Sequence, residues 1–222
     1  MADPTADGDA EDGQGWPALA ALLEAGDAPD RDHGGTRGRF EQVRTSLLLA
    51  EPLVSTGRFA VFAGHARFEV ESPQPSLMLV TPNVVTLIDP ETGDVERYER
   101  DPQAEPDPAT DLLGLLLTRD LVRLQRSFTA RATQAPAPDT AAFLLTPRSE
   151  ADPDSSLPLL RVSLELGVAT GEPRRLRVEQ TDGDALELRF FELRHDPDLT
   201  IEQMLSPPAG TALPKDAETT TP

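Results

Sequence analysis

The segment 174–193 constrains the fold of this chain more than any other part of its sequence. Apolar and charged residues alternate there on both sides of a central Asp182-Gly183-Asp184 sequence. Because successive side chains of a strand point to opposite faces of a sheet, the segment predicts an antiparallel hairpin with one apolar and one charged face. A three-residue loop, Asp182 to Asp184, would pair Val178 with Leu188. The apolar face of this hairpin must then be covered by another part of the molecule.

Similar alternation along most of the chain predicts a mainly β protein with about eleven strands. Turn sequences rich in proline, glycine and aspartate separate the strands. Before the hairpin, we expect strands at 39–49, 54–63, 66–72, 76–81, 84–89, 94–99, 125–133, 140–146 and 158–166. The strand at 76–81 is apolar on both faces, so its second face must be covered as well.

Two segments have the pattern of helices. Residues 16–25 begin with Pro17 in the first turn, place their large apolar residues on one stripe, and are followed by Gly26. Residues 110–124 carry leucines around most of the helix. A helix this apolar is buried on several sides or lies against a ligand, so it can be a lid or a core helix.

The chain has 222 residues, enough for one domain with a sizeable core. We expect this domain to span 16–213. Residues 1–15 are acidic and rich in glycine, and residues 214–222 contain no core-forming side chain. Both ends are therefore expected to be disordered.

The net charge of −19 disfavours partners that present phosphates, which excludes nucleic acid and anionic membrane surfaces as expected ligands. Cysteine is absent, so disulfides, thiolate metal sites and a lipid-attachment cysteine are excluded for the sequence as given. No apolar run reaches the ~20 residues of a membrane-spanning helix, and the first residues lack the features of a signal peptide. The protein is expected either in the cytoplasm or, after removal of a leader, outside it.

The sequence carries no recognisable catalytic or metal-binding motif, and we expect no cofactor. His33, His65 and His195 are too far apart for any metal-ligand spacing. The acidic run 7–13 lacks the glycine and glutamate positions of a calcium loop. No serine lies in a nucleophile-elbow sequence.

Five short sequences resemble those of the outer-membrane lipoprotein carrier family, which has the LolA/LolB-like fold. They are Phe-Glu-Gln at 40–42, Ser-Thr-Gly at 55–57, Leu-Thr-Pro at 145–147, Val-Glu-Gln-Thr-Asp at 178–182 and Pro-Pro-Ala-Gly at 207–210. Their order and spacing extend the resemblance over 16–213. One position departs from it: between the second and third strands, where the family often has an arginine before a proline, this chain has Ala63-Gly64-His65-Ala66.

The resemblance implies an open, incomplete antiparallel β-barrel with an N-terminal helix and a central helical lid. Its function would be that of a soluble, monomeric, non-enzymatic carrier or chaperone of the bacterial cell envelope, with a periplasmic location. Its partners would be the acyl chains of lipoproteins or other lipids, together with an envelope transporter or receptor protein. The residues expected to line the acyl cavity are Phe59, Val61, Phe68, Val70, Leu77, Leu79, Leu112, Leu115, Leu116, Leu160, Val162, Leu164, Leu176, Val178, Leu188 and Phe190.

Two alternatives remain open from the sequence. The same half-barrel also occurs in a violacein-biosynthesis protein, so the chain could be a small-molecule enzyme. The polar groups for such a site would come from Arg67, Glu69, Arg97, Tyr98 and Glu99. The apolar positions could instead fill an ordinary core, which would make the chain a structural or interaction domain.

Overall fold

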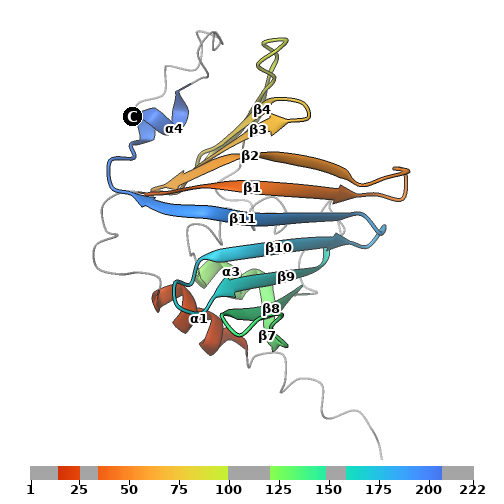
Figure 1. Cartoon of the computed structure of the whole chain (residues 1–222), viewed down its shortest axis with the longest axis vertical. Helices are drawn as coiled ribbons and strands as arrows, with labels where there is room; N and C mark the ends of the chain where they lie inside the picture. Colours follow the sequence, from red (N-terminus) through yellow and green to blue (C-terminus); the bar gives the residue numbers. More distant parts are fainter. Residues whose placement is uncertain (1–14, 26–34, 100–120, 149–158, 207–222) are drawn as a thin grey trace, which may run out of the picture.

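The computed structural model describes residues 15–25, 35–99, 121–148 and 159–206. Its strands are β1 (Gly35–Thr45), β2 (Leu53–Phe62), β3 (His65–Ser72), β4 (Ser76–Val80), β5 (Val84–Ile88), β6 (Val95–Glu99), β7 (Phe128–Thr133), β8 (Thr140–Pro147), β9 (Leu159–Gly167), β10 (Pro173–Gln180) and β11 (Ala185–Asp196). They form one antiparallel sheet in the order β6-β5-β4-β3-β2-β1-β11-β10-β9-β8-β7 (Figure 1). The sheet is open, because its edge strands β6 and β7 do not pair with each other. The expectation of an open, mainly β fold is confirmed.

In the part of the chain that the structure describes, three helices accompany the sheet: α1 (Gly15–Ala25), α3 (Leu121–Ser127) and α4 (Ile201–Leu205). Among the described residues, none of the helices is long and apolar enough to cross a bilayer. The expected N-terminal helix is present as α1. Most of the expected helix at 110–124, the central lid of the resemblance, lies outside the described residues, as do nearly all of the two ends expected to be disordered.

Several element boundaries differ from the expectation, and β1 begins at Gly35 rather than at residue 39. The first strand ends at Thr45 rather than at residue 49, because Ser46 accepts a backbone hydrogen bond from Leu49 that closes a turn. The strand expected from residue 125 begins at Phe128, because α3 continues through Ser127.

The hairpin predicted from the alternating segment is present, but its register differs from the expected one. Val178 lies opposite Leu186 instead of Leu188. The difference is two residues, so each side chain keeps the face that the alternation predicts. The predicted cross-strand pairs of the hairpin are therefore wrong, but the predicted face of each side chain is correct.

The reason for this difference lies in the loop. A backbone hydrogen bond of 2.8 Å from Gln180 N to Asp184 O encloses a three-residue loop at 181–183, one position earlier than expected. Gly183 has a φ of 92°, which only glycine adopts readily. The loop thus places its glycine at the third position, where three-residue hairpin loops need a left-handed residue.

The two faces of the sheet have different chemistry. We call the face that carries the main apolar cluster the inner face and the opposite one the outer face. The inner face packs against α1 and α3, whereas α4 lies on the outer face of β2 and β3. The main cluster consists of Trp16, Leu19, Leu23, Phe40, Phe59, Val61, Ala66, Phe68, Leu124, Phe128, Ala130, Phe143, Leu145, Val162, Leu164, Leu166, Leu176, Leu188 and Phe190.

Candidate functional site

Four phenylalanines form an aromatic group on the inner face of β1, β2, β3 and β11. The ring of Phe59 stacks on Phe68 at 6.0 Å between centroids and meets the edge of Phe190 at 5.3 Å. Phe40 contacts Phe68 edge-on at 5.9 Å. Offset and edge-on contacts of this kind add to the stabilisation that comes from burial alone. This group joins the two halves of the sheet where its first and last strands pair.

Two glycines make room for these rings. A Cβ at Gly57 would lie 2.9 Å from Cζ of Phe40 and 2.0 Å from the carbonyl oxygen of Glu69. A Cβ at Gly38 would lie 2.7 Å from Cε1 of Phe59. The aromatic rings therefore lie directly against the backbone of β1 and β2, which brings the apolar surface close to the sheet.

Most residues predicted to line a cavity lie together on the inner face. Eight of them belong to the main cluster: Phe59, Val61, Phe68, Val162, Leu164, Leu176, Leu188 and Phe190. Val70 and Val178 are partly buried against the same cluster. The alternation of apolar and polar residues in each strand is the signal that identified them.

Leu77 and Leu79 do not lie on this face, which corrects the expectation. Phe68 of the inner face is opposite Met78, so the neighbours of Met78 on β4 point to the outer face. There they form a separate cluster with Ile88. A strand that is apolar on both sides has no alternation that could show which side faces the main cluster.

Leu160 also departs from the prediction, because its side chain is 47% exposed. It lies at the start of β9, where the pairing with β10 shifts register. Leu112, Leu115 and Leu116 lie outside the described residues.

The prediction missed several members of the main cluster. Phe40 and Phe128 are almost completely buried, and Phe143 and Leu145 join them from β8. Phe143 and Leu145 alternate in burial with their neighbours, but apolar Leu144 lies between them, so the sequence does not show which side of the strand faces the cluster. Phe40 stands among polar residues on β1, and no apolar alternation marks it.

The polar residues of the enzyme hypothesis do not all lie on one face. Arg67 and Glu69 are hydrogen-bonded to each other at 2.7 Å on the outer face, and the register places Arg97 and Glu99 on that face as well. Arg67 donates hydrogen bonds to the carbonyl oxygens of Met204 (3.0 Å) and Ser206 at the end of α4, on the outer face. Tyr98 belongs to the inner face, because the partners Val85 and Val80 connect it to Ala66. Side chains on opposite faces cannot converge on one pocket, so Tyr98 cannot share a catalytic site with the other residues of this hypothesis.

The outer face of β9, β10, β11 and β1 carries a ladder of ion pairs. Glu187 is the central carboxylate, and its side chain is only 7% exposed. Arg175 reaches it at 2.6 Å, Arg189 at 2.8 Å and Arg177 at 3.4 Å. Burial disfavours the charged form of Glu187, but the hydrogen bonds and charges of Arg175 and Arg189 outweigh it and hold its pKa below the ordinary value. Charge thus stabilises the outer face of these strands.

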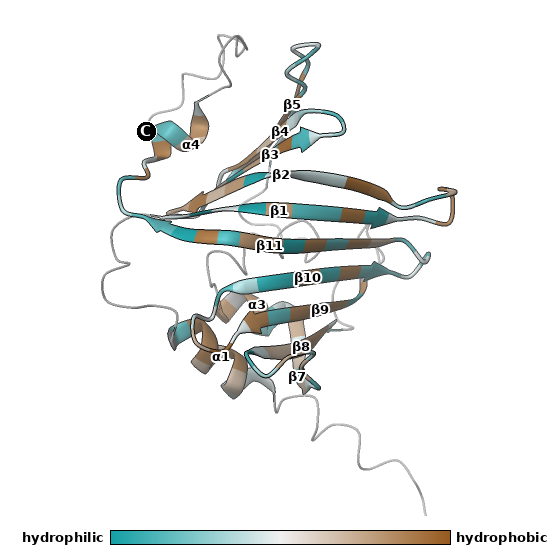
Figure 2. Ribbon diagram, viewed as in Figure 1, coloured by the Kyte–Doolittle hydropathy of each residue, from teal (hydrophilic) through white to brown (hydrophobic). Residues whose placement is uncertain are grey.

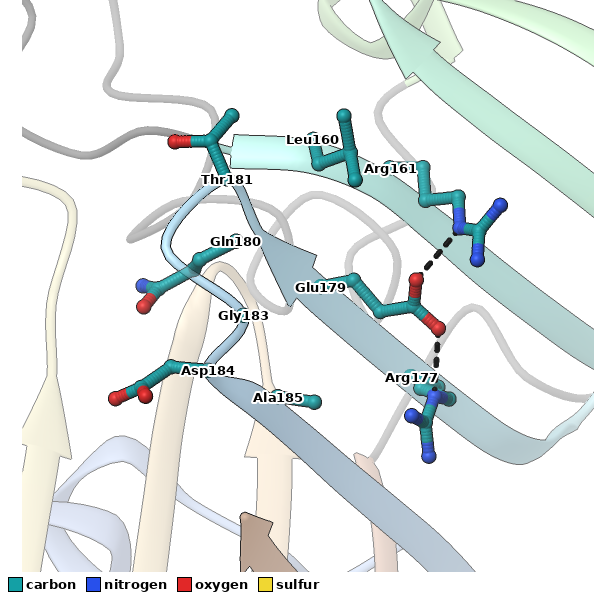
Figure 3. A pocket seen from close by; sticks show the side chains of 9 residues that line it. All are labelled: Leu160, Arg161, Arg177, Glu179, Gln180, Thr181, Gly183, Asp184 and Ala185. Atoms are coloured by element: carbon teal, nitrogen blue, oxygen red, sulfur yellow. Dashed lines mark hydrogen bonds and ion pairs between the residues drawn. The ribbon is translucent and has the colours of Figure 1, made fainter. Parts of the chain in front are cut away.

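A hollow of about 380 Å³ lies at the β10–β11 turn (Figure 3). Glu179 accepts a hydrogen bond from Arg177 at 2.8 Å and one from Arg161 at 2.6 Å, so both guanidinium groups are already paired. These two hydrogen bonds lower the pKa of Glu179, despite its partial burial. None of the residues that line this open hollow belongs to the main apolar cluster. In the part of the chain that the structure describes, no group of three or more His, Asp or Glu side chains could hold a metal ion.

Known structures with a similar fold cover most of the chain. An uncharacterized conserved protein from Thermus thermophilus has 13% sequence identity and a TM-score of 0.52, with 88% of this chain and 95% of that chain covered. A LolA superfamily protein from Nitrosomonas europaea has 9% identity and a TM-score of 0.42, over 85% and 97% of the two chains. Lipoprotein LppX from Mycobacterium tuberculosis has 12% identity and a TM-score of 0.40, over 80% and 95%.

At these identities the structural likeness shows the fold alone. No curated protein matches the chain significantly. The family comparison is more decisive, because the sequence matches the family of the outer membrane lipoprotein carrier protein LolA over residues 33–203. That range runs from just before β1 into α4 and includes all eleven strands. The chain therefore belongs to the LolA family of outer membrane lipoprotein carrier proteins.

Proposed function

We propose that this protein is a non-enzymatic carrier that holds acyl chains of lipids or lipoproteins against the inner face of its open sheet. The observation that supports this most directly is an apolar surface that continues from the buried cluster to an exposed edge. In a family of carriers, such a surface offers an acyl chain both a binding place and an entrance.

The strand register defines this surface. Phe68 is opposite Met78, and Met78 is opposite Leu87, so three neighbouring strands place apolar side chains in one row. Exposure rises along the row, from 5% at Phe68 to 37% at Leu87. A parallel row runs from buried Ala66 to half-exposed Tyr98 at β6. The row of Phe68 ends on β6 at Glu96, whose carboxylate accepts a hydrogen bond of 2.6 Å from the hydroxyl of Tyr98. An acyl chain that enters at the β6 edge therefore passes this polar pair first and then meets apolar side chains of increasing burial.

The separation of charge between the two faces supports the same proposal. The ion pairs centred on Glu187 lie on the outer face, as do those of Arg58, which join β2 to β3 through Glu69 and Glu71. Charged side chains offer an acyl chain no favourable contact, and they reduce the apolar area that the chain can bury. A face with apolar rows, whose ion pairs lie on the opposite side of the sheet, suits a hydrocarbon ligand better than a polar metabolite.

The proposal extends to the location and the partners. Carriers of this family work in the periplasm, and we place this protein there as a monomer that receives its cargo from one envelope protein and delivers it to another. The experiment is native mass spectrometry of the full chain purified from its own cell envelope. A species heavier by one lipid or lipoprotein acyl moiety is expected. Protein without such a species, which also takes up no fatty-acyl probe, would contradict the carrier function.

A further inference from the structure

The β1–β2 loop exposes an unusual amount of aliphatic surface. Five side chains, which we call the β1–β2 tip, are at least 44% exposed: Leu47, Leu48, Leu49, Leu53 and Val54. Leu47 is 82% exposed and Leu48 is 95% exposed. The loop projects at one end of the sheet, away from α4, and carries hydrophobic colour in Figure 2. Single exposed leucines are common on protein surfaces, but a contiguous aliphatic group on one loop marks an interaction site.

The turn itself argues against a structural reason for these leucines. A hydrogen bond of 3.1 Å from Leu49 N to Ser46 O closes the turn, which puts Leu47 and Leu48 at its two central positions. Glycine, proline, asparagine, aspartate and serine favour such positions, because they adopt the backbone conformation easily or bond to it. The two leucines go against this preference of turn positions, and they gain no stabilisation from burial because both are exposed. Residues that break a local rule without a structural gain indicate a functional surface.

From these observations we infer that the β1–β2 tip inserts into the surface of a lipid bilayer whose headgroups are zwitterionic. The tip is convex and purely aliphatic, whereas the centres of protein interfaces favour aromatic side chains, methionine and arginine. A projecting aliphatic turn needs a medium that deforms around it, and the hydrocarbon boundary of a bilayer provides that. This inference concerns a surface outside the proposed acyl site, and it does not depend on what that site holds.

The charges beside the tip indicate which bilayer it meets. A Cβ at Gly183 would lie 3.4 Å from Cδ1 of Leu47, so the β10–β11 turn lies against the tip. That turn carries the carboxylates of Asp182 and Asp184, and the tip loop itself adds Glu51, so carboxylates outnumber the guanidinium of Arg44, which lies opposite Leu53. Carboxylates at this level attract the ammonium groups of zwitterionic lipids and repel anionic headgroups. The net charge of −19 acts in the same direction over a longer range.

The test is flotation of the full chain with vesicles of phosphatidylcholine. The unaltered protein should float with them, and the double variant Leu47→Ser/Leu48→Ser should lose at least about tenfold in partitioning, because two almost fully exposed leucines no longer enter hydrocarbon. The matched control is Val168→Ser/Ile201→Ser, which removes two exposed aliphatic side chains at the opposite end of the sheet and should float normally. Phosphatidylglycerol in the vesicles should weaken flotation.

Three results would overturn the inference. One is unaltered protein that stays in solution, and another is equal flotation of the tip variant and the control. The third is a lipid-free dimer in sedimentation analysis that Leu47→Ser/Leu48→Ser converts to monomer, because the tip would then bind a second copy. Uptake of a fatty-acyl probe from solution separates this test from the carrier proposal. The tip variant should still take up the probe. If the unaltered protein, the tip variant and the control all failed to take it up, only the carrier function would be contradicted.

Discussion

Phe190 shows how tightly the inner face is packed in the four-phenylalanine group. Its side chain is 6% exposed and lies against Phe59, so Phe190→Ala should reduce the free energy of unfolding by about 3–5 kcal/mol through lost burial and the cavity left behind. Phe191 is the matched control, because it points to the outer face and is 39% exposed. Phe191→Ala should cost less than about 1 kcal/mol. Urea denaturation measures both, and similar small losses would show that the ring of Phe190 is not packed as described.

Glu187 makes stability depend on pH. Its pKa is lower in the folded protein than in the unfolded chain, so its stabilisation is complete above the ordinary glutamate pKa and is lost as the pH falls through the folded value. Glu187→Gln should reduce stability at pH 7 by about 1.5–3 kcal/mol, since three arginines lose a charged acceptor. The variant should also lose less stability than the unaltered protein between about pH 5 and pH 3.

The control for this prediction is Glu99→Gln at the exposed end of β6, which should leave the pH profile unchanged. Unfolding by urea at a series of pH values measures all three proteins. If Glu187→Gln and the unaltered protein had parallel profiles, the ion-pair ladder would not be the source of the pH dependence.

At the scale of single residues, the sequence predicts which side chains share a face but not which groups meet. Alternation alone placed Leu176, Val178, Leu188 and Phe190 on one face, and the structure places them there. The convergence of three arginines on Glu187 depends on the register of the β10–β11 hairpin, because all four residues lie on these two strands. The expected register would have placed Glu187 opposite Glu179, whereas the observed one places it opposite Arg177.

Among the elements, strands with alternating sequence could be predicted well, and strands without it could not. β4 shows the limit: with apolar residues on both sides, its sequence cannot show that Met78 faces the main cluster and Leu77 and Leu79 face away. The hairpin shows a second limit, because the loop position depends on the backbone conformation of Gly183. The β1–β2 loop shows a third, since its leucines resemble the continuation of a strand.

The attachment of α4 depends on Arg67. Its guanidinium binds two carbonyl oxygens at the C-terminal end of the helix, where positive charge and hydrogen-bond donors stabilise the last turn. Arg67→Met should increase amide exchange over 199–206 by about tenfold and leave the sheet protected. Arg58→Met is the control, because Arg58 on neighbouring β2 makes ion pairs with Glu69 and Glu71 but no bond to α4. Equal exchange in the two variants would show that apolar packing alone holds α4.

On the scale of the whole molecule, the resemblance in five short sequences was enough to predict the family and the open sheet, and both are confirmed. The apolar rows that lead to the β6 edge could not be predicted, because they combine residues from four strands whose register only the structure gives. The exposed aliphatic tip could not be predicted from the sequence for a different reason. Exposure depends on where a strand ends, and the expected first strand extended through the residues that form the turn.

The most direct test of the central claim, that the inner face binds acyl chains, is titration with a fluorescent fatty acid. Trp16, the single tryptophan of the chain, belongs to the main cluster and provides an internal signal. We expect saturable uptake that changes the fluorescence of Trp16. Val178→Gln, on the partly buried inner face, should weaken uptake by at least about fivefold, because a polar amide replaces apolar contact. Phe191→Gln, on the outer face, should not change it. Absence of saturable uptake, or equal weakening by the two variants, would contradict the account.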